Sequence, residues 1–372
     1  MKLNGSRHRT ELLARLRPGR THSRLELAAA TGLSVATVSR ITRDLVRRRV
    51  LLEIEGSRTG LGRPTQGLEL NGDTGRVLGI SLLYPSLKGV VLNLRGEILK
   101  RTSAPLPWNR GPAGVLRPLR HVIRSLSRGG LRLAAVGLAL PGQWDPVRGL
   151  SIQYPRIPSW QDVPIRRHLE TWAGVPATLI GYAPAMAVAE LSRRRPAEPR
   201  NLITIEVAEN IAMGAIVNGA VLEGASGNAG ELGHIPIDPK GPPCYCGGRG
   251  CLETLAACSA VTGGLRDRSY SAAVRAAAGG DDACRELLGR AGFTLGKGLA
   301  TALNLFNPEV LVLNGHFFDA GDFVTDPVKR AIQEHAVPSA LKRLTIEESV
   351  FGPLAAPLGA GLAAIHDAVR RM

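Results

Sequence analysis

The sequence has few cysteines, and their scarcity limits the class of protein that it encodes. Five occur among 372 residues, and three of these fall close together, at Cys244, Cys246 and Cys251. The others are too few for a framework of disulfides, which is typical of small secreted proteins. We therefore expect a protein of a reducing compartment, the cytoplasm.

Long apolar runs are also almost absent. One uncharged run, from Thr171 to Ala189, reaches the length of a membrane span, but two glycines and two prolines interrupt it. Such a composition favours a buried strand, a turn and the start of a helix. The opening residues, MKLNGSRHRT, contain no apolar core of the signal-peptide type. The sequence thus predicts a cytoplasmic protein with no membrane partner.

Acidic residues are outnumbered, and the imbalance is uneven. The chain has 47 Lys and Arg against 31 Asp and Glu, a formal net charge of +16. Residues 1–70 hold 14 of the basic and 6 of the acidic residues, so half of the excess lies in under a fifth of the chain. A strongly basic amino-terminal segment (the head), followed by a longer and less densely charged remainder (the body), suggests a module that binds nucleic acid. A generally arginine-rich proteome would also produce it, so charge alone leaves both explanations open.

Signals for a helix-turn-helix occur in order along this basic head. Ser23 and Glu26 form a capping box before one predicted helix, and Gly32 supplies a tight turn after it. Ser34 then caps a second helix. Two predicted strands follow, and the loop between them, GSRTGLGRPT at residues 56–65, is typical of the wing of a winged helix.

One face of the helix that follows Ser34 is suited to a major groove. Val38, Ile41 and Leu45 share the other face and are expected to pack inward. Small residues near the helix start allow close approach to bases, and arginines can bond guanine or phosphate. A small helical domain that binds protein is the alternative. The residues expected to contact DNA are Ser34, Ala36, Thr37, Arg40, Arg43, Arg58 and Arg63.

Residues of metal-ligand type gather between positions 230 and 253. Cys244, Cys246 and Cys251 offer thiolates, and His234 offers an imidazole. These are the ligands that Zn²⁺ prefers, and four of them make a closed tetrahedral site. Intervening glycines and prolines allow the tight folding that such a site needs. We expect a structural Zn²⁺; a loop with clustered free cysteines is the alternative.

Beyond residue 71, predicted strands alternate with helices. Residues 76–82 and 88–94 are rich in β-formers and predict a hairpin, and residues 115–126 have helical patterning. Strands that pair as hairpins and are then crossed by helices indicate an α/β body of two lobes.

The motifs together resemble the ROK family (repressors, open reading frames and sugar kinases). This family joins a winged helix to an actin-like, ribonuclease H-like body. The resemblance implies two lobes with a cleft, a homodimer or homotetramer, a palindromic operator and a sugar-type effector. The segments that carry it are LELAAATGLSVATVSRITRDLV, GRP at residues 62–64, ALPGQWDP, SGNAGELGH, CYCGGRGCLE and NPEVLVLNG.

Departures from the family's kinases imply that the body is not an enzyme. Their Asp-x-Gly-x-Thr phosphate loop corresponds here to SLLYP, Ser81 to Pro85. Their glycine-rich second phosphate segment reads VAENIAMG, in which Glu209 would repel phosphate, and their late Gly-Gly is Asn314-Gly315. Their Asn-Asp pair, whose Asp is the general base, falls at Gly181 and Tyr182. A tyrosine with a pKa near ~10 is a poor base at neutral pH.

The resemblance also implies an effector site. Glu231, His234 and Glu253 match the family residues that contact sugar hydroxyls, and His234 would serve both metal and sugar. Arg156 replaces an Asn of the opposite wall, beside Tyr182. Arg156 and Tyr182 either form a modified pocket or fill an abandoned one, with Arg156 paired to a carboxylate. A carbohydrate-related ligand other than an ordinary hexose is therefore expected.

On these grounds we expect a cytoplasmic transcriptional repressor with a catalytically inactive body. An active sugar kinase with a DNA-binding head is one alternative, and a DNA-binding protein whose body only oligomerises is another. The expected domains are a winged helix at residues 1–72, a first lobe at 73–192 plus 352–372, and a second lobe at 193–351.

Overall fold

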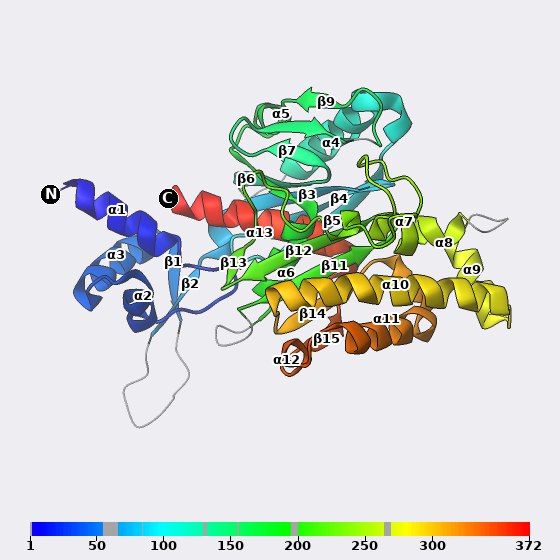
Figure 1. Cartoon of the computed structure of the whole chain (residues 1–372). Coiled ribbons are helices and arrows are strands. Elements are labelled where there is room, and N and C mark those ends of the chain that lie inside the picture. Colours follow the sequence, from blue (N-terminus) through cyan, green and yellow to red (C-terminus); the bar gives the residue numbers. More distant parts are fainter. Residues whose placement is uncertain are drawn as a thin grey trace. The chain divides into compact units, whose positions relative to one another are not determined.

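Three helices and a two-stranded antiparallel sheet form the head of the chain (Figure 1). The computed structural model describes residues 2–54, 66–83, 85–128, 132–154, 156–194, 200–263 and 269–372, with side chains from residue 7 onward. The elements of the head are α1 (Lys2–Leu13), α2 (Arg24–Thr31), α3 (Val35–Arg47), β1 (Leu51–Ile54) and β2 (Gly67–Leu70). The predicted wing loop, with Arg58 and Arg63, lies outside the described residues.

Local capping explains where the helices of the head begin and end. The Ser23 hydroxyl accepts a hydrogen bond from the Glu26 amide, and the Glu26 carboxylate accepts one from the Ser23 amide. Gly32 ends α2 with φ +68°, a left-handed conformation that glycine adopts without strain. The Ser34 hydroxyl accepts from the Thr37 amide and starts α3. The predicted helix-turn-helix is therefore confirmed.

A five-stranded sheet forms the centre of the first compact unit, which comprises residues 1–180 and 356–372 and includes the head. The strand order is β10-β6-β3-β4-β5, with β3–β4 and β4–β5 antiparallel and β3–β6 parallel. A smaller sheet, β7-β8-β9, packs into the same core. The strands are β3 (Arg76–Leu83), β4 (Ser86–Asn93), β5 (Ile98–Pro105), β6 (Leu133–Leu140), β7 (Gln143–Asp145), β8 (Leu150–Gln153), β9 (Gln161–Val163) and β10 (Ala177–Gly181).

Helices cover both faces of this sheet. Leu78 and Ile80 on β3 share a buried cluster with residues of α4 (Gly111–Ser127) and α5 (Ile165–Ala173). Gly79 points to the other face, where a Cβ would lie 2.0 Å from the Pro357 carbonyl oxygen. That oxygen belongs to α13 (Ala355–Arg370), coloured red in Figure 1, so the C-terminal helix packs directly on the sheet backbone.

The second unit, residues 181–355, has a five-stranded sheet of its own. The strand order is β13-β12-β11-β14-β15, in which β14 runs parallel to both neighbours and β11–β12 is antiparallel. α6 packs on β12, α10 packs along α11, and a buried cluster of α10, α11 and inward-facing strand residues forms the core. The strands are β11 (Leu202–Val207), β12 (Ile211–Val217), β13 (Ala220–Val221), β14 (Val310–Asn314) and β15 (Thr345–Glu348). The helices are α6 (Tyr182–Ser192), α7 (Leu252–Ala256), α8 (Cys258–Thr262), α9 (Tyr270–Ala278), α10 (Asp282–Phe306), α11 (Asp322–His335) and α12 (Pro338–Leu341).

A winged helix-turn-helix followed by two α/β units is the architecture that the sequence predicts. The units divide at residues 180/181 and 355/356, whereas the expected lobes divide at 192/193 and 351/352. The difference is mainly α6, which packs on β12: a Cβ at Gly214 would lie 2.1 Å from the Ala183 carbonyl oxygen. No helix among the described residues is long and apolar enough to cross a membrane.

Candidate metal centre, effector site and DNA-binding surface

A short glycine-rich loop brings the four candidate metal ligands together in the second unit. His234 ends a single 3-10 turn (Leu232–His234), and Cys251 immediately precedes α7. Isolated β-bridges, Pro236 with Cys251 and Pro243 with Arg249, fold the intervening chain back on itself. Gly250 has φ +59°, and a Cβ there would lie 1.6 Å from the Asp238 carbonyl oxygen. Only glycine fits this close approach.

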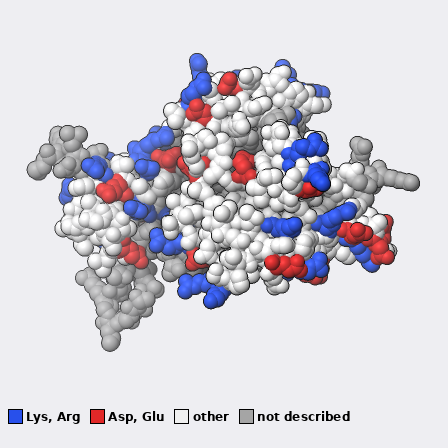
Figure 2. All heavy atoms as spheres, in the orientation of Figure 1, with Lys and Arg blue, Asp and Glu red and all other residues white. Residues whose placement is uncertain are grey.

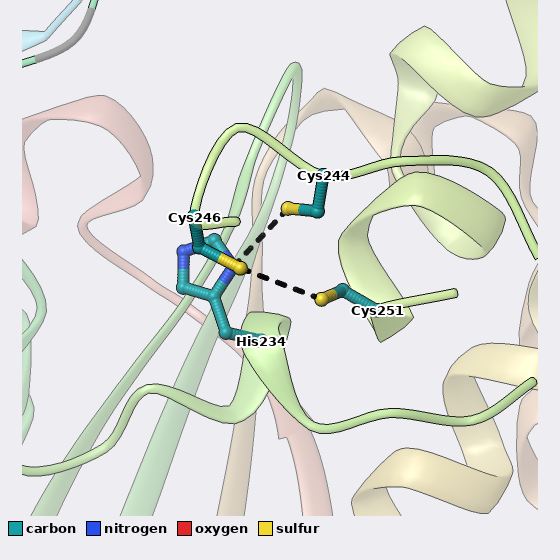
Figure 3. A group of neighbouring side chains, drawn as sticks. All are labelled: His234, Cys244, Cys246 and Cys251. Carbon is teal, nitrogen blue, oxygen red and sulfur yellow. Dashed lines mark hydrogen bonds between the residues drawn. The ribbon is translucent and has the colours of Figure 1, made fainter. Parts of the chain in front are cut away.

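The ligand atoms have the spacing of a tetrahedral zinc site. One donor atom from each of His234, Cys244, Cys246 and Cys251 lies within 4.8 Å of all the others (Figure 3). The Cys244 Sγ to His234 Nδ1 distance is 3.6 Å, and the Cys246 Sγ to Cys251 Sγ distance is also 3.6 Å. Bond lengths of about 2.3 Å to sulfur and about 2.0 Å to nitrogen imply S–S and S–N separations of about 3.5–3.8 Å in a tetrahedron. The side chains therefore fit a Zn²⁺ ion.

The three thiols have different acidities because their surroundings differ. Burial, followed by hydrogen bonds with Cys246 and Cys244, raises the pKa of Cys251 to about 12. Burial likewise raises the pKa of Cys244, whereas the hydrogen bond from the Gly248 amide lowers that of Cys246. Without a cation, neighbouring thiolates repel each other, so this cluster favours protons or a bound metal ion.

The two ring nitrogens of His234 have different neighbours. Nδ1 faces the sulfur atoms, as Figure 3 shows, while Nε2 lies 3.2 Å from the Tyr245 hydroxyl and 3.8 Å from Glu231 Oε2. A hydrogen bond at the distal nitrogen fixes the ring orientation of a metal-bound histidine. Sequence reasoning missed Tyr245; its position between Cys244 and Cys246 was the only available signal.

The other expected effector residues occupy contrasting environments. The Glu231 side chain is 61% exposed, whereas Glu253 is 5% exposed and accepts a hydrogen bond from the Ile211 amide at 2.9 Å. Glu231 and His234 are therefore neighbours. Glu253 lies on α7, and one of its carboxylate oxygens accepts a hydrogen bond from β12. Arg156 belongs to the first unit, where it is exposed.

Tyr182 joins a buried polar group that sequence reasoning did not anticipate. The residue is 8% exposed, and its hydroxyl donates to Glu206 Oε1 at 3.4 Å. Asn314 Nδ2 donates to Glu206 Oε2 at 2.8 Å. Tyr182 matches the Asp of the kinases' Asn-Asp pair, and Asn314 matches the first Gly of their late Gly-Gly motif. Both side chains form hydrogen bonds with Glu206, which therefore links the two positions.

A histidine–carboxylate pair lies at another segment that matches the kinases. Glu209 Oε1 is 3.7 Å from Nε2 of His316, which follows β14. The nearby Glu209 carboxylate raises the pKa of His316, with help from the charges of Asp319 and Glu206 and against the effect of burial. No sequence pattern predicts this pair, because the two residues are far apart along the chain.

The predicted DNA-reading face of α3 is accessible. Ala36, Arg40 and Arg43 are exposed, while Ser34 is exposed at the cap and Thr37 is half-buried beside it. The opposite face supplies Val38, Ile41 and Leu45 to the core of the head. Val35 is an addition that the sequence reasoning missed: it is 46% exposed at the helix start, where an apolar side chain can contact a thymine methyl. On the visible surface, basic and acidic side chains are interspersed over both head and body (Figure 2).

Known proteins resemble this chain over most of its length. The xylose repressor of Bacillus spizizenii is 27% identical over 344 residues, which cover 91% of this chain and 89% of the repressor. A ROK family transcriptional regulator, a homolog of the Escherichia coli Mlc protein, has a crystal structure that matches with a TM-score of 0.81 and 26% identity over 98% of this chain and 96% of its own. The ROK hexokinase of Thermus thermophilus is 32% identical, with a TM-score of 0.66, over 78% of this chain and 97% of its own. The model of the ROK family itself matches residues 78–366, and the chain belongs to the ROK family.

Proposed function

We propose that the protein is a transcriptional repressor that binds a palindromic operator as a homodimer or homotetramer. One observation carries the proposal: α3 is capped by Ser34 and exposes Ala36, Arg40 and Arg43 on the face opposite its buried residues. A capped helix with small and basic residues near its start can enter a major groove. The repressors and the transcriptional regulator among its relatives support the same function.

Selection of duplexes from fragmented genomic DNA by the full-length protein tests this proposal. We expect an enriched palindromic motif that the protein binds at moderate salt. Arg40→Ala should weaken binding to that motif by about 1–3 kcal/mol. Arg124→Ala removes the same charge from an exposed position on α4 and serves as the control. Absence of any enriched motif would overturn the proposal.

We further propose that His234 Nδ1, Cys244, Cys246 and Cys251 hold a structural Zn²⁺. Four protein ligands leave no open position for water, so the ion would brace the loop rather than catalyse a reaction. The distances and the restricted rotation of His234 support this assignment. Plasma mass spectrometry of the purified protein should find about one zinc ion per chain, as a closed four-ligand site implies.

A carbohydrate-related effector is proposed to bind at Glu231, His234 and Glu253, with Arg156 and Tyr182 as further candidates. Adjacent to the loop, exposed Glu231 and the Nε2 side of His234 offer hydrogen-bonding groups for hydroxyls. Tyr182 has little exposed ring for stacking, so its contribution would come through Glu206. The effector changes DNA affinity only if it binds one conformation better than another.

A thermal-shift panel of neutral sugars, sugar phosphates and sugar acids tests the effector proposal. A ligand that raises Tm in the wild type and not in Glu231→Gln supports it. If every compound leaves Tm unchanged, the alternative of a DNA-binding protein whose body only oligomerises is favoured.

The body is proposed to be catalytically inactive. Two features support this: Tyr182 stands at the position of the family's general base, and Glu209 stands in the segment that is glycine-rich in the kinases, where a carboxylate would repel phosphate. The resemblance to a ROK hexokinase keeps an active sugar kinase as the second candidate. A coupled assay for ADP with ATP, Mg²⁺ and a sugar panel separates the two, because turnover that exceeds the background would overturn inactivity.

A further inference from the structure

A hollow lined by arginines lies where the first helix of the head meets the C-terminal helix. Figure 1 shows α1 beside the end of α13, and the Arg9 guanidinium donates a hydrogen bond to the Met372 carbonyl. Both helices belong to the first unit. The hollow has a volume of about 560 Å³, in the range of small-molecule sites. Its lining consists of Arg7, Thr10, Glu11, Ala14 and Arg15 from the head and Arg370 from α13.

The charge of this lining is unbalanced. Three guanidinium groups face one carboxylate, that of Glu11, so the lining has two positive charges in excess. Two other arginines of the head, Arg9 and Arg48, each lie within 4 Å of the Asp44 carboxylate. Among the described residues, in contrast, no carboxylate lies within 4 Å of the guanidinium of Arg7, Arg15 or Arg370. The lining therefore carries a net positive charge of two, and its guanidinium groups form no ion pair within 4 Å among the described residues.

A neighbouring histidine lies within reach of the charge of Arg370. His366 lies one helical turn before Arg370 on α13. Burial lowers the pKa of His366 most, and the charge of Arg370 lowers it further, with Asp367 acting in the opposite direction. An unneutralised guanidinium has this effect on a nearby titratable group.

We propose that this hollow is a binding site for a phosphate group, held by Arg7 and Arg15 from the head and Arg370 from the C-terminal helix. Guanidinium groups bind phosphate oxygens through paired N–H donors, and two excess positive charges match a phosphate dianion. The phosphate belongs either to the backbone of bound DNA or to a small phosphorylated molecule. A phosphomonoester presents three such oxygens and about two negative charges, whereas a DNA phosphodiester presents two oxygens and one charge. Guanidinium groups bind both through charged hydrogen bonds.

Binding at this position has a mechanical consequence. Two of the donors are on the head and one is on the helix that packs on the body's sheet, so a bound phosphate bridges them. A ligand that binds only the docked arrangement stabilises it by mass action. Phosphate should therefore strengthen the docking of α1 on α13.

Two charge-neutral variants and a matched control test the proposal in the full-length protein. Arg15→Gln and Arg370→Gln each remove one donor from the lining. Arg371→Gln removes the same charge one residue away, at an exposed position outside the lining. Circular dichroism confirms that all three fold, and Arg15→Lys, which keeps the charge, provides a second check on the same position.

One arm uses inorganic phosphate and pyrophosphate at constant ionic strength, with calorimetric titration and thermal shift as readouts. If a small phosphorylated molecule is the natural occupant, the wild type and Arg371→Gln should bind these probes saturably. The two lining variants should bind them at least ~10-fold more weakly, which corresponds to about 1.4 kcal/mol for a lost charged contact.

The other arm uses a duplex of random sequence and measures affinity against salt by fluorescence anisotropy. If DNA phosphate is the occupant, the slope of log affinity against log salt concentration falls in magnitude by about 1 for each lining variant. The slope stays unchanged for the control Arg371→Gln. Neither arm needs an operator, so failure of operator recognition leaves this test intact. The proposal is overturned if both lining variants behave like Arg371→Gln in both arms.

Discussion

His234 is the residue at which two chemical roles meet. Its Nδ1 faces three sulfur atoms, while its Nε2 faces Tyr245 and Glu231. A metal ion on one nitrogen fixes the ring and its tautomer, so the other nitrogen presents a defined hydrogen-bonding group. Loss of the proposed Zn²⁺ should therefore disturb the proposed effector site without changing any residue in it.

Substitution of Cys246 by serine should separate these roles. We expect Cys246→Ser to lose most of its bound zinc, because three ligands remain and the hydroxyl is a much poorer ligand than thiolate. The unfolding temperature of the second unit should fall, while the head stays folded because it lies in another unit. Metal analysis and calorimetry measure the two effects. Cys284→Ser, outside the cluster, is the control, and full zinc content in Cys246→Ser would rule out its ligand role.

The Glu209–His316 pair predicts a pH dependence with a definite sign. Because the pKa of His316 is raised in the folded protein, the pair contributes its full stabilisation below the unfolded value of about 6.5. That contribution is lost as pH rises through the raised pKa. Both side chains are partly exposed, at 45% and 39%, so solvent screening keeps the effect small.

Glu209→Gln should bring the pKa of His316 back toward its ordinary value. Imidazole resonances followed by NMR from pH 5 to 9 measure this directly, and the urea midpoint should become less dependent on pH over the same range. Glu286→Gln, exposed on α10, is the matched control. An unchanged His316 titration in Glu209→Gln would refute the pairing.

Secondary-structure elements whose ends depend on residues close by in the chain were predictable from sequence. Ser23 with Glu26, Gly32 and Ser34 mark helix ends through contacts within three residues, so the helix-turn-helix could be read locally. The metal cluster was predictable for a different reason: few residue types bind zinc, and four of them lie within 18 positions.

Elements that depend on distant partners were not predictable in this way. Glu206 meets Tyr182 on one side and Asn314 on the other, 24 and 108 residues away along the chain. The sequence of α6 is compatible with either unit, because the helix is apolar on all faces. Only its packing on β12 assigns it to the second unit. Periodicity reveals that such a helix is buried, but not against which sheet.

The contact between α13 and β6 provides a test at this scale. A Cβ at Gly137 would lie 1.9 Å from the Ala360 carbonyl oxygen, so Gly137→Ala must push the helix away from the sheet. We expect a loss of about 1–3 kcal/mol or more of unfolding free energy, measured with urea. Gly289→Ala, on α10, is the control: a Cβ there would lie 3.9 Å from the Pro327 side chain on α11, so alanine should be neutral or stabilising. Equal effects would contradict the close packing.

For the whole molecule, the division into two units predicts a local response to metal removal. A strong chelator should abolish hydrogen-exchange protection in residues 230–256 and leave that of α2 and α3 unchanged, because the loop and the head share no unit. Mass-spectrometric hydrogen exchange measures both regions in one experiment. Cys246→Ser, already lacking metal, should not respond to the chelator. Unchanged protection after verified metal loss would show that the loop does not depend on the ion.

The return of α13 to the first unit has a consequence for the order in which the protein matures. A ribosome completes residues 181–355 before it releases the helix that covers Gly79 and Gly137. The second unit can therefore finish folding while one face of the sheet of the first unit is still uncovered. Domains made early in synthesis usually fold first, but here the amino-terminal unit must wait for the last residues of the chain. A stop codon near residue 355 would thus damage the end of the protein that was made first.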